Sequence, residues 1–169
     1  FWGVRGSIPT PGADFLKFGG NTSCVELEIE KQIIIFDMGS GLKNLGESIL
    51  ERKIKKFDIL MSHFHYDHTC GLPFFRPAFT PGLNFSIRSG KLITRGKTKY
   101  VLQKQISSPS FPISIDEFSA NINYVNFEVK KDFWIQDSIK VSSILLNHPD
   151  GAVGYRVEGD NKSLCYITD

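Results

Sequence analysis

The chain has 169 residues, of which 41% are hydrophobic, so it is long enough to bury a core and is expected to form a single domain. Its 20 lysines and arginines against 18 aspartates and glutamates give a formal charge of +2, which favours neither a nucleic-acid nor a membrane partner. No apolar run reaches the roughly 20 residues of a membrane span, and the first residues do not have the layout of a signal peptide.

The three cysteines, Cys24, Cys70 and Cys165, are far apart in the sequence and odd in number. They do not form the spacing pattern of a disulfide framework. We therefore expect reduced thiols and a cytoplasmic protein.

The first predicted elements are two strands, a helix and a third strand. Apolar residues alternate with glutamates over 25–30, which predicts a half-buried strand. After a turn at Lys31, residues 33–36 are continuously apolar, as is typical of a strand covered on both faces. Residues 41–53 have apolar side chains at helical spacing, and residues 57–62 predict a short apolar strand.

The second half of the chain is predicted to be mostly β. Three prolines interrupt residues 71–82, which indicates a loop or short helical turns. Residues 92–105 are compatible with a helix, and Ser114 to Glu117 has the spacing of a capping box at a helix start. Three β-like runs follow, at 122–129, 139–147 and 152–168. The last run predicts a hairpin that turns at 159–161. Mixed strands and helices predict an α/β fold with a sheet covered by helices.

Polar residues follow four of the apolar, strand-like runs. These residues are Asp37, His63, His148 and Asp169. Side chains at strand ends converge on one edge of a layered α/β fold, where ligands bind. The sequence therefore predicts a metal site assembled across that edge.

The segment His63-Phe64-His65-Tyr66-Asp67-His68 holds three of the four histidines of the chain. His63 and His65 can point the same way from extended backbone, so both imidazoles can reach one ion. Asp67 and His68 follow a change of chain direction and can face a second ion. Imidazole nitrogen with carboxylate oxygen suits zinc and tolerates manganese or iron. The alternative is a solvated polar loop whose histidines are incidental.

The pattern HxHxDH, with "GGNTSCVEL", "IIFDMGSG", "NHPDGAVGYRVE" and "YITD" in this order around it, resembles the metallo-β-lactamase superfamily. The similarity covers nearly the whole chain and is greatest to the stand-alone metal-dependent hydrolases near the PhnP-type cyclic phosphodiesterases and ribonuclease Z. The motif is highly specific for the superfamily and weakly specific for substrate. The resemblance to this superfamily implies an αββα sandwich.

The resemblance implies two divalent metal ions held by six side chains, three on the first ion, two on the second and one bridging the pair. In that order they are His63, His65 and His148, then Asp67 and His68, then Asp169. Asp37 matches a superfamily aspartate that orients the ligands through hydrogen bonds, although a simple turn-former before Gly39 is the alternative. The superfamily normally has one more histidine after the bridging aspartate, and this chain has none. We therefore expect an incomplete sandwich over 1–169, truncated at both ends and chiefly at the C-terminal end.

The residue set predicts a binuclear metal-dependent hydrolase. Two cations roughly 3.5–4 Å apart lower the pKa of a bridging water and supply hydroxide at neutral pH. Asp67 is the candidate catalytic residue, as the acceptor of a proton or as the group that positions the nucleophile. The expected substrate is a cyclic nucleotide or another small phosphodiester, since the chain lacks a long basic arm for tRNA. The alternatives are thioester, lactone or β-lactam substrates, or a metal- or ligand-sensing domain without catalysis. Relatives of this kind often form homodimers.

Residues outside the cluster are weaker candidates. Arg5 lies near a Pro/Gly-rich loop and could contact a substrate phosphate, although a surface charge is the alternative. Phe74, Phe75 and Phe79 could wall a substrate pocket, but core packing is the simpler interpretation. Cys70 is interpreted as structural.

Overall fold

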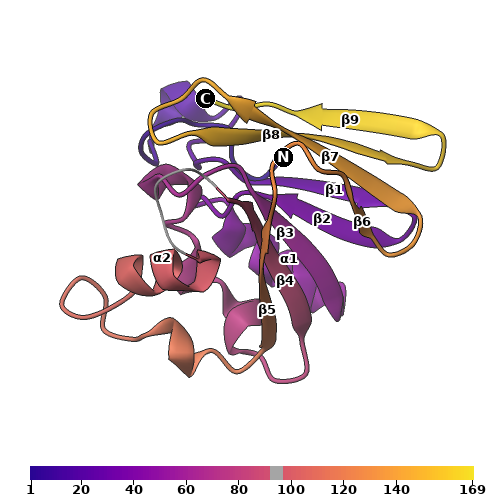
Figure 1. Ribbon diagram of the computed structural model, residues 1–169. Helices are drawn as coiled ribbons and strands as arrows, with labels where there is room; N and C mark the ends of the chain where they lie inside the picture. The colour runs from indigo at the N-terminus through magenta and orange to yellow at the C-terminus, as the bar shows by residue number, and fades with distance from the viewer. Residues whose placement is uncertain (92–96) are drawn as a thin grey trace.

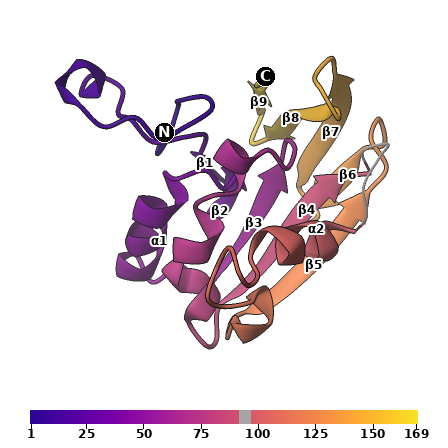
Figure 2. The ribbon, with the colours of Figure 1, turned by 90° about the vertical axis from the view of Figure 1, so that its left-hand side faces the viewer.

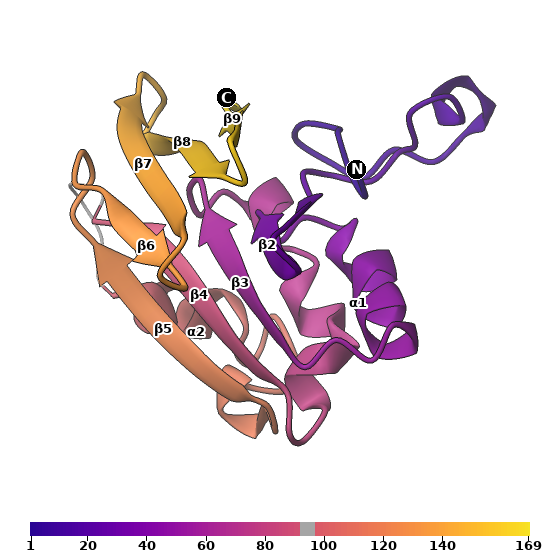
Figure 3. The same ribbon diagram turned by 90° about the vertical axis from the view of Figure 1, so that its right-hand side faces the viewer.

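Two β-sheets lie face to face, and both α-helices cover the outer face of the larger sheet (Figure 1, Figure 2). This computed structural model describes residues 1–91 and 97–169. In the described part of the chain, no α-helix covers the outer face of the smaller sheet (Figure 3). The arrangement is helix layer, sheet, sheet, which gives three of the four layers of the expected αββα sandwich.

The larger sheet has five strands in chain order, and the smaller sheet has four. The first contains β1 (Val25–Ile29), β2 (Gln32–Phe36), β3 (Lys56–Met61), β4 (Asn84–Gly90) and β5 (Asn121–Phe127). β1 is antiparallel to β2, whereas β2 to β5 are parallel. The second is antiparallel throughout and contains β6 (Phe133–Ile135), β7 (Ile139–Leu146), β8 (Ala152–Gly159) and β9 (Lys162–Tyr166).

Two α-helices and five short 3₁₀ turns connect the strands. The helices are α1 (Leu42–Glu51) and α2 (Thr98–Gln105). The 3₁₀ turns are η1 (Ala13–Phe15), η2 (Tyr66–His68), η3 (Leu72–Phe74), η4 (Arg76–Phe79) and η5 (Ile115–Glu117). No helix of the described residues is long and apolar enough to cross a membrane.

The strand β2 separates two hydrophobic cores. Ile33 and Ile35 face the helices and belong to the first core, while Ile34 and Phe36 face the smaller sheet and belong to the second. Side chains alternate across a strand, so a strand between two cores needs apolar residues at every position. The continuous apolar run of 33–36 was therefore correctly interpreted as a strand covered on both faces.

Most elements predicted from the sequence are confirmed, with two strands missed. The hairpin of β8 and β9 turns at Asp160 and Asn161, both with positive φ, as a two-residue turn requires. The predicted helix over 92–105 corresponds to α2, but its residues 92–96 lie outside the described residues. The capping box is present, yet it begins a single 3₁₀ turn, η5, rather than an α-helix. β4 and β6 were not predicted.

Two loops of the larger sheet pack so tightly that glycine is required between them. A Cβ on Gly39 would lie 2.5 Å from the carbonyl oxygen of Asp67 and 2.6 Å from that of Ser23. Backbone hydrogen bonds run from the Met38 amide to the His68 carbonyl and from the Gly71 amide to the Met38 carbonyl. The loop after β2 thus holds the loop that carries η2.

Gly39→Ala is expected to destabilise the protein, because the added methyl group meets backbone atoms that cannot rotate away. Overpacking of this kind costs about 1–3 kcal/mol of unfolding free energy, measured by urea denaturation. Gly6→Ala is the matched control, since a Cβ there meets nothing within 4 Å. Equal unfolding free energies for the two variants would contradict this packing argument.

Candidate metal centre

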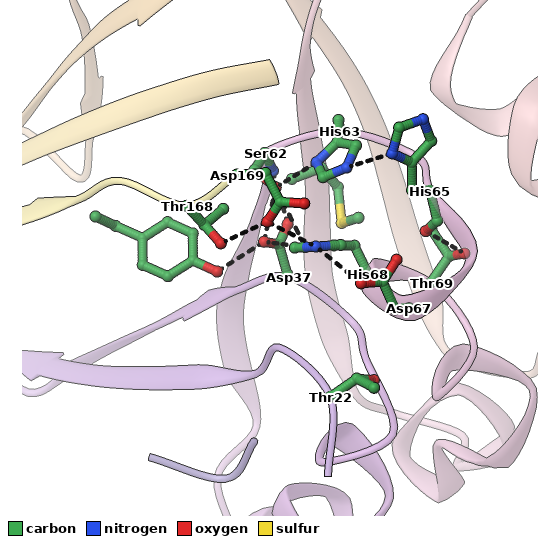
Figure 4. Close-up of polar contacts among 12 residues, drawn as sticks. Thr22, Asp37, Ser62, His63, His65, Asp67, His68, Thr69, Thr168 and Asp169 are labelled. Atoms are coloured by element: carbon green, nitrogen blue, oxygen red, sulfur yellow. Dashed lines mark hydrogen bonds and ion pairs between the residues drawn. The ribbon is translucent and has the colours of Figure 1, made fainter. Parts of the chain in front are cut away.

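Polar side chains from both sheets meet at one edge of the sandwich (Figure 4). Asp37 directly follows β2, and His63 lies two residues after β3. η2 carries Asp67 and His68, while His148 and Asp169 follow β7 and β9. All six predicted ligand residues and Asp37 therefore lie at strand ends or in the turn after β3.

A first group of candidate ligands contains three histidines. The distance from His63 Nε2 to His65 Nδ1 is 3.0 Å, and that from His148 Nε2 to His65 Nδ1 is 2.9 Å. The three ligand atoms lie within 4.8 Å of one another, a spacing at which they could hold one metal ion. His63 and His65 come from one extended segment, as their spacing predicts.

A second group contains His63, His68 and Asp169, again with ligand atoms within 4.8 Å of one another. His68 Nε2 lies 3.4 Å from Asp169 Oδ1 and 3.5 Å from Asp67 Oδ2. Asp169 Oδ2 is also 3.9 Å from His148 Nε2, so this carboxylate faces both groups. The two groups share His63 and are adjacent.

Asp37 is fully buried, and its carboxylate accepts four hydrogen bonds. Oδ1 accepts from the Ser62 amide at 2.7 Å. Oδ2 accepts from Ser62 Oγ at 2.7 Å, from His68 Nδ1 at 2.8 Å and from the Tyr166 hydroxyl at 2.8 Å. Its backbone has a φ of 60°, which a non-glycine residue keeps only where its surroundings fix it. Asp37 therefore does more than form a turn: it fixes the orientation of the His68 ring.

The hydroxyl of Ser62 determines which nitrogen of His63 carries the proton. The hydroxyl has one proton, which it donates to the negative carboxylate of Asp37 at 2.7 Å. Ser62 Oγ also lies 3.0 Å from His63 Nδ1, and must accept there. Burial, with the neighbouring His68 charge as the next cause, lowers the pKa of His63 to about 4, so the ring is neutral at pH 7. His63 Nε2 is then an unprotonated lone pair that faces the first group.

Hydrogen bonds alone cannot satisfy the three imidazoles of the first group while His63 Nε2 is unprotonated. His65 Nδ1 faces both His63 Nε2 and His148 Nε2 at about hydrogen-bond distance. With His63 Nε2 unprotonated, a proton on His65 Nδ1 can be donated to only one of the two, and a proton on His148 leaves His65 and His63 lone pairs facing each other. A metal ion between the three nitrogens would accept all the lone pairs. The donor set therefore fits a cation.

His68 gives a second indication of a cation. Its Nε2 is buried and has no hydrogen-bond partner among the described residues. Burial by itself lowers the pKa of His68, but the Asp37 hydrogen bond and the surrounding carboxylate charges outweigh burial and raise it. Burial raises the pKa of Asp169, yet the Thr168 hydrogen bond and the nearby imidazoles lower it overall. These carboxylates thus favour positive charge at His68 Nε2, which a proton or a metal ion can supply.

Two predicted residues lie at the margin of the cluster. Asp67 is buried beside His68, and its Oδ2 accepts the Ser7 amide at 2.8 Å, although it belongs to neither group of ligand atoms. The Arg5 guanidinium lies over the ring of Phe15, with 4.5 Å between the Arg5 Cζ and the ring centroid. No contact of the described residues joins Arg5 to the cluster, so its role in substrate binding stays a prediction.

Sequence reasoning missed three groups that contact the cluster. Ser62 directly precedes His63, and its position was the available signal. Tyr166, which stacks on Phe36 at 4.7 Å, was within the quoted segment "YITD". The Ser7 amide leaves no signal in the sequence, because any residue other than proline has one. Cys70 lies 3.6 Å from Thr22 Oγ1, and burial raises its pKa, in agreement with a structural role.

Ser62→Ala is expected to change the tautomer of His63 in the metal-free protein. Without Oγ, nothing holds the proton on Nδ1, and ¹⁵N shifts of the ring should show a mixture of tautomers instead of the Nδ1–H form. Ser89→Ala is the control, because Ser89 is another buried serine, hydrogen-bonded to Thr98 at 2.6 Å. An unchanged His63 tautomer in Ser62→Ala would show that the hydroxyl does not set it.

Comparison with known proteins identifies relatives of the chain. The model of the family described as "Beta-lactamase superfamily domain" matches residues 34–169. Ribonuclease Z of Staphylococcus saprophyticus is 28% identical over 171 residues, which cover 94% of this chain and 48% of that protein. The chain spans about half the length of the curated relatives it matches.

Solved structures show the same fold at low sequence identity. The metallo-beta-lactamase fold protein YhfI from Bacillus subtilis has a TM-score of 0.69 and 14% identity, with 99% of this chain and 61% of that chain covered. The short form of human tRNase Z has a TM-score of 0.65 and 18% identity, with 100% and 68% covered. The fold is therefore the mixed α/β fold of the metallo-β-lactamases.

Proposed function

We propose that this chain, which belongs to the beta-lactamase superfamily, carries the metal centre of a hydrolase that cleaves phosphodiester bonds. One observation carries the proposal: two adjacent groups of candidate ligand atoms share His63, and the Asp169 carboxylate faces both. The names of two relatives, ribonuclease Z and tRNase Z, support a phosphodiester substrate, because nucleases cleave phosphodiesters.

The proposed ligand assignment places His63 on the first ion alone and adds Asp67 to the second group. His63, His65 and His148 would hold one ion. His68, Asp67 and Asp169 would hold the other, with Asp169 shared between the two. Two divalent cations, zinc first and manganese or iron as alternatives, would supply Lewis acidity and a water of lowered pKa.

Asp67 is the proposed catalytic residue. Its carboxylate lies beside His68 and is oriented by the Ser7 amide, with Oδ2 as the acceptor. A carboxylate fixed in this way can accept the proton of the attacking water. It can then donate this proton to the leaving alkoxide. The Asp37 carboxylate keeps the proton of His68 on Nδ1, so that Nε2 stays directed at the centre.

A small diester such as a cyclic nucleotide is the proposed substrate. The formal charge of +2 provides little of the electrostatic attraction by which proteins bind long nucleic acids. The same centre could act on an RNA through contacts outside this chain, so the substrate is assigned by assay of the full-length protein.

Metal-loaded full-length protein is expected to hydrolyse bis(4-nitrophenyl) phosphate, and Asp67→Ala should lower kcat by about 10²–10⁴-fold. Release of 4-nitrophenol is followed with zinc and with manganese, and metal content is measured on the same samples. Asp137→Ala is the control, because Asp137 is an exposed carboxylate remote in sequence from the cluster. Protein with both ions bound and no turnover of any phosphodiester would rule out this function.

A further inference from the structure

A small hollow of about 90 Å³ opens beside the turn that carries Asp67 and His68. Tyr66, Thr69, Phe74, Gln105 and Phe111 are among the residues that line it. One water occupies about 30 Å³ in the liquid, so the hollow is small, and a single ring suits it better than a fused pair of rings. None of the functions assigned above to the metal centre uses it.

The hollow adjoins the backbone that carries the metal-ligand candidates. Thr69 Oγ1 donates a hydrogen bond to the His65 carbonyl at 3.2 Å. Gln105 Nε2 donates to the Phe64 carbonyl at 2.7 Å. Tyr66 directly precedes Asp67 in η2. The hollow therefore adjoins the backbone of the segment that carries His65, Asp67 and His68.

Three aromatic side chains line the hollow, and two of them are largely exposed. Tyr66 is 73% exposed and Phe74 is 57% exposed. Phe111 meets Phe74 edge to face, with 5.7 Å between ring centroids. Phe75 is buried in the first core and Phe79 packs against it, so the core interpretation of the three phenylalanines holds for these two and not for Phe74. Nucleobases stack on exposed aromatic faces of this kind.

Gln105 adds a hydrogen-bond acceptor. Its amide nitrogen is used by the Phe64 carbonyl, which fixes the orientation of the amide. The other atom, Oε1, is buried and has no hydrogen-bond partner among the described residues. A buried acceptor without a donor is costly, and a ring that carries an N–H group could supply the donor.

We propose that this hollow is a subsite for the base of a nucleotide substrate, and specifically for a single-ring pyrimidine that carries an N–H donor. The base stacks on the exposed aromatic side chains of Tyr66 and Phe74 while the phosphodiester lies at the metal centre. This inference rests on the proposed function and specifies its substrate class.

Steady-state kinetics of the full-length, metal-loaded protein test the subsite. The substrates are cytidine 2′,3′-cyclic phosphate and a base-free analogue, 1-O-methylribose 2,3-cyclic phosphate. Phe74→Ala should raise KM for the cytidine substrate about ten-fold or more, the size of a lost stacking contact, and should reduce the preference for it over the base-free diester. Tyr100→Ala is the matched control, since Tyr100 is a 56% exposed aromatic residue on α2 that does not line the hollow.

Binding without turnover separates this inference from the proposed function. In an NMR titration of the metal-free protein, cytidine 5′-monophosphate should shift the Phe74 and Phe111 ring signals and ribose 5-phosphate should not. Turnover of diesters with equal efficiency with and without a base would overturn the subsite and leave the hydrolase intact. No turnover of any diester, with cytidine monophosphate still bound at these rings, would overturn the hydrolase and retain the subsite. A stronger response to adenosine than to cytidine monophosphate would contradict the single-ring assignment.

Discussion

The buried carboxylate of Asp37 joins the elements from which the candidate metal centre is built. It follows β2 and accepts hydrogen bonds from Ser62 after β3, from His68 in η2 and from Tyr166 at the end of β9. A buried charge is costly unless hydrogen bonds compensate it, and four donors do so here. Because those donors come from both sheets, the interaction that stabilises the charge also fixes the positions of the ligand-bearing loops.

The sandwich explains how the smaller sheet contributes to a site formed mainly by the larger one. Its inward residues pack on Ile34, Phe36 and Leu60 in the second core. The Tyr155 hydroxyl of β8 donates to the Met61 carbonyl at 2.6 Å, and the Val153 amide donates to the Ser62 carbonyl. These bonds hold β8 against the end of β3, so that the residues after β7 and β9 reach the histidines after β3.

Proton positions favour metal binding by this cluster over a network of hydrogen bonds alone. Ser62 and Asp37 place the protons of His63 and His68 on the Nδ1 atoms. His63 Nε2 then faces His65 as a lone pair, and His68 Nε2 faces the Asp67 and Asp169 carboxylates. A metal ion in each group would satisfy both nitrogens. Ser62 and Asp37 are not candidate ligands, but their hydrogen bonds determine which nitrogen of His63 and of His68 can face an ion.

The candidate ligands could be named from the sequence because most of them are local, and their role as ligands stays a prediction. Residues 63–68 fix their mutual geometry by spacing alone, and Asp37, His148 and Asp169 were recognised from their positions after apolar runs. Groups that act through the backbone or across sheets, such as the Ser7 amide, leave no local pattern.

The two missed strands show the same limit in the fold. β4 has only two large apolar residues, Phe85 and Ile87, and one of its polar residues, Arg88, is paired with Asp58 of β3 at 2.8 Å. β6 has three residues, which are too few to show a period of two. Both strands depend on neighbours that only the folded chain brings beside them.

The most direct test of this account is anomalous diffraction at the zinc edge from crystals of the zinc-loaded protein. The account predicts two peaks, one among the nitrogens of His63, His65 and His148, and one beside His68 Nε2 and the Asp169 carboxylate. Zinc-saturated crystals without a peak at either position, with His68 Nε2 hydrogen-bonded to a carboxylate instead, would contradict it.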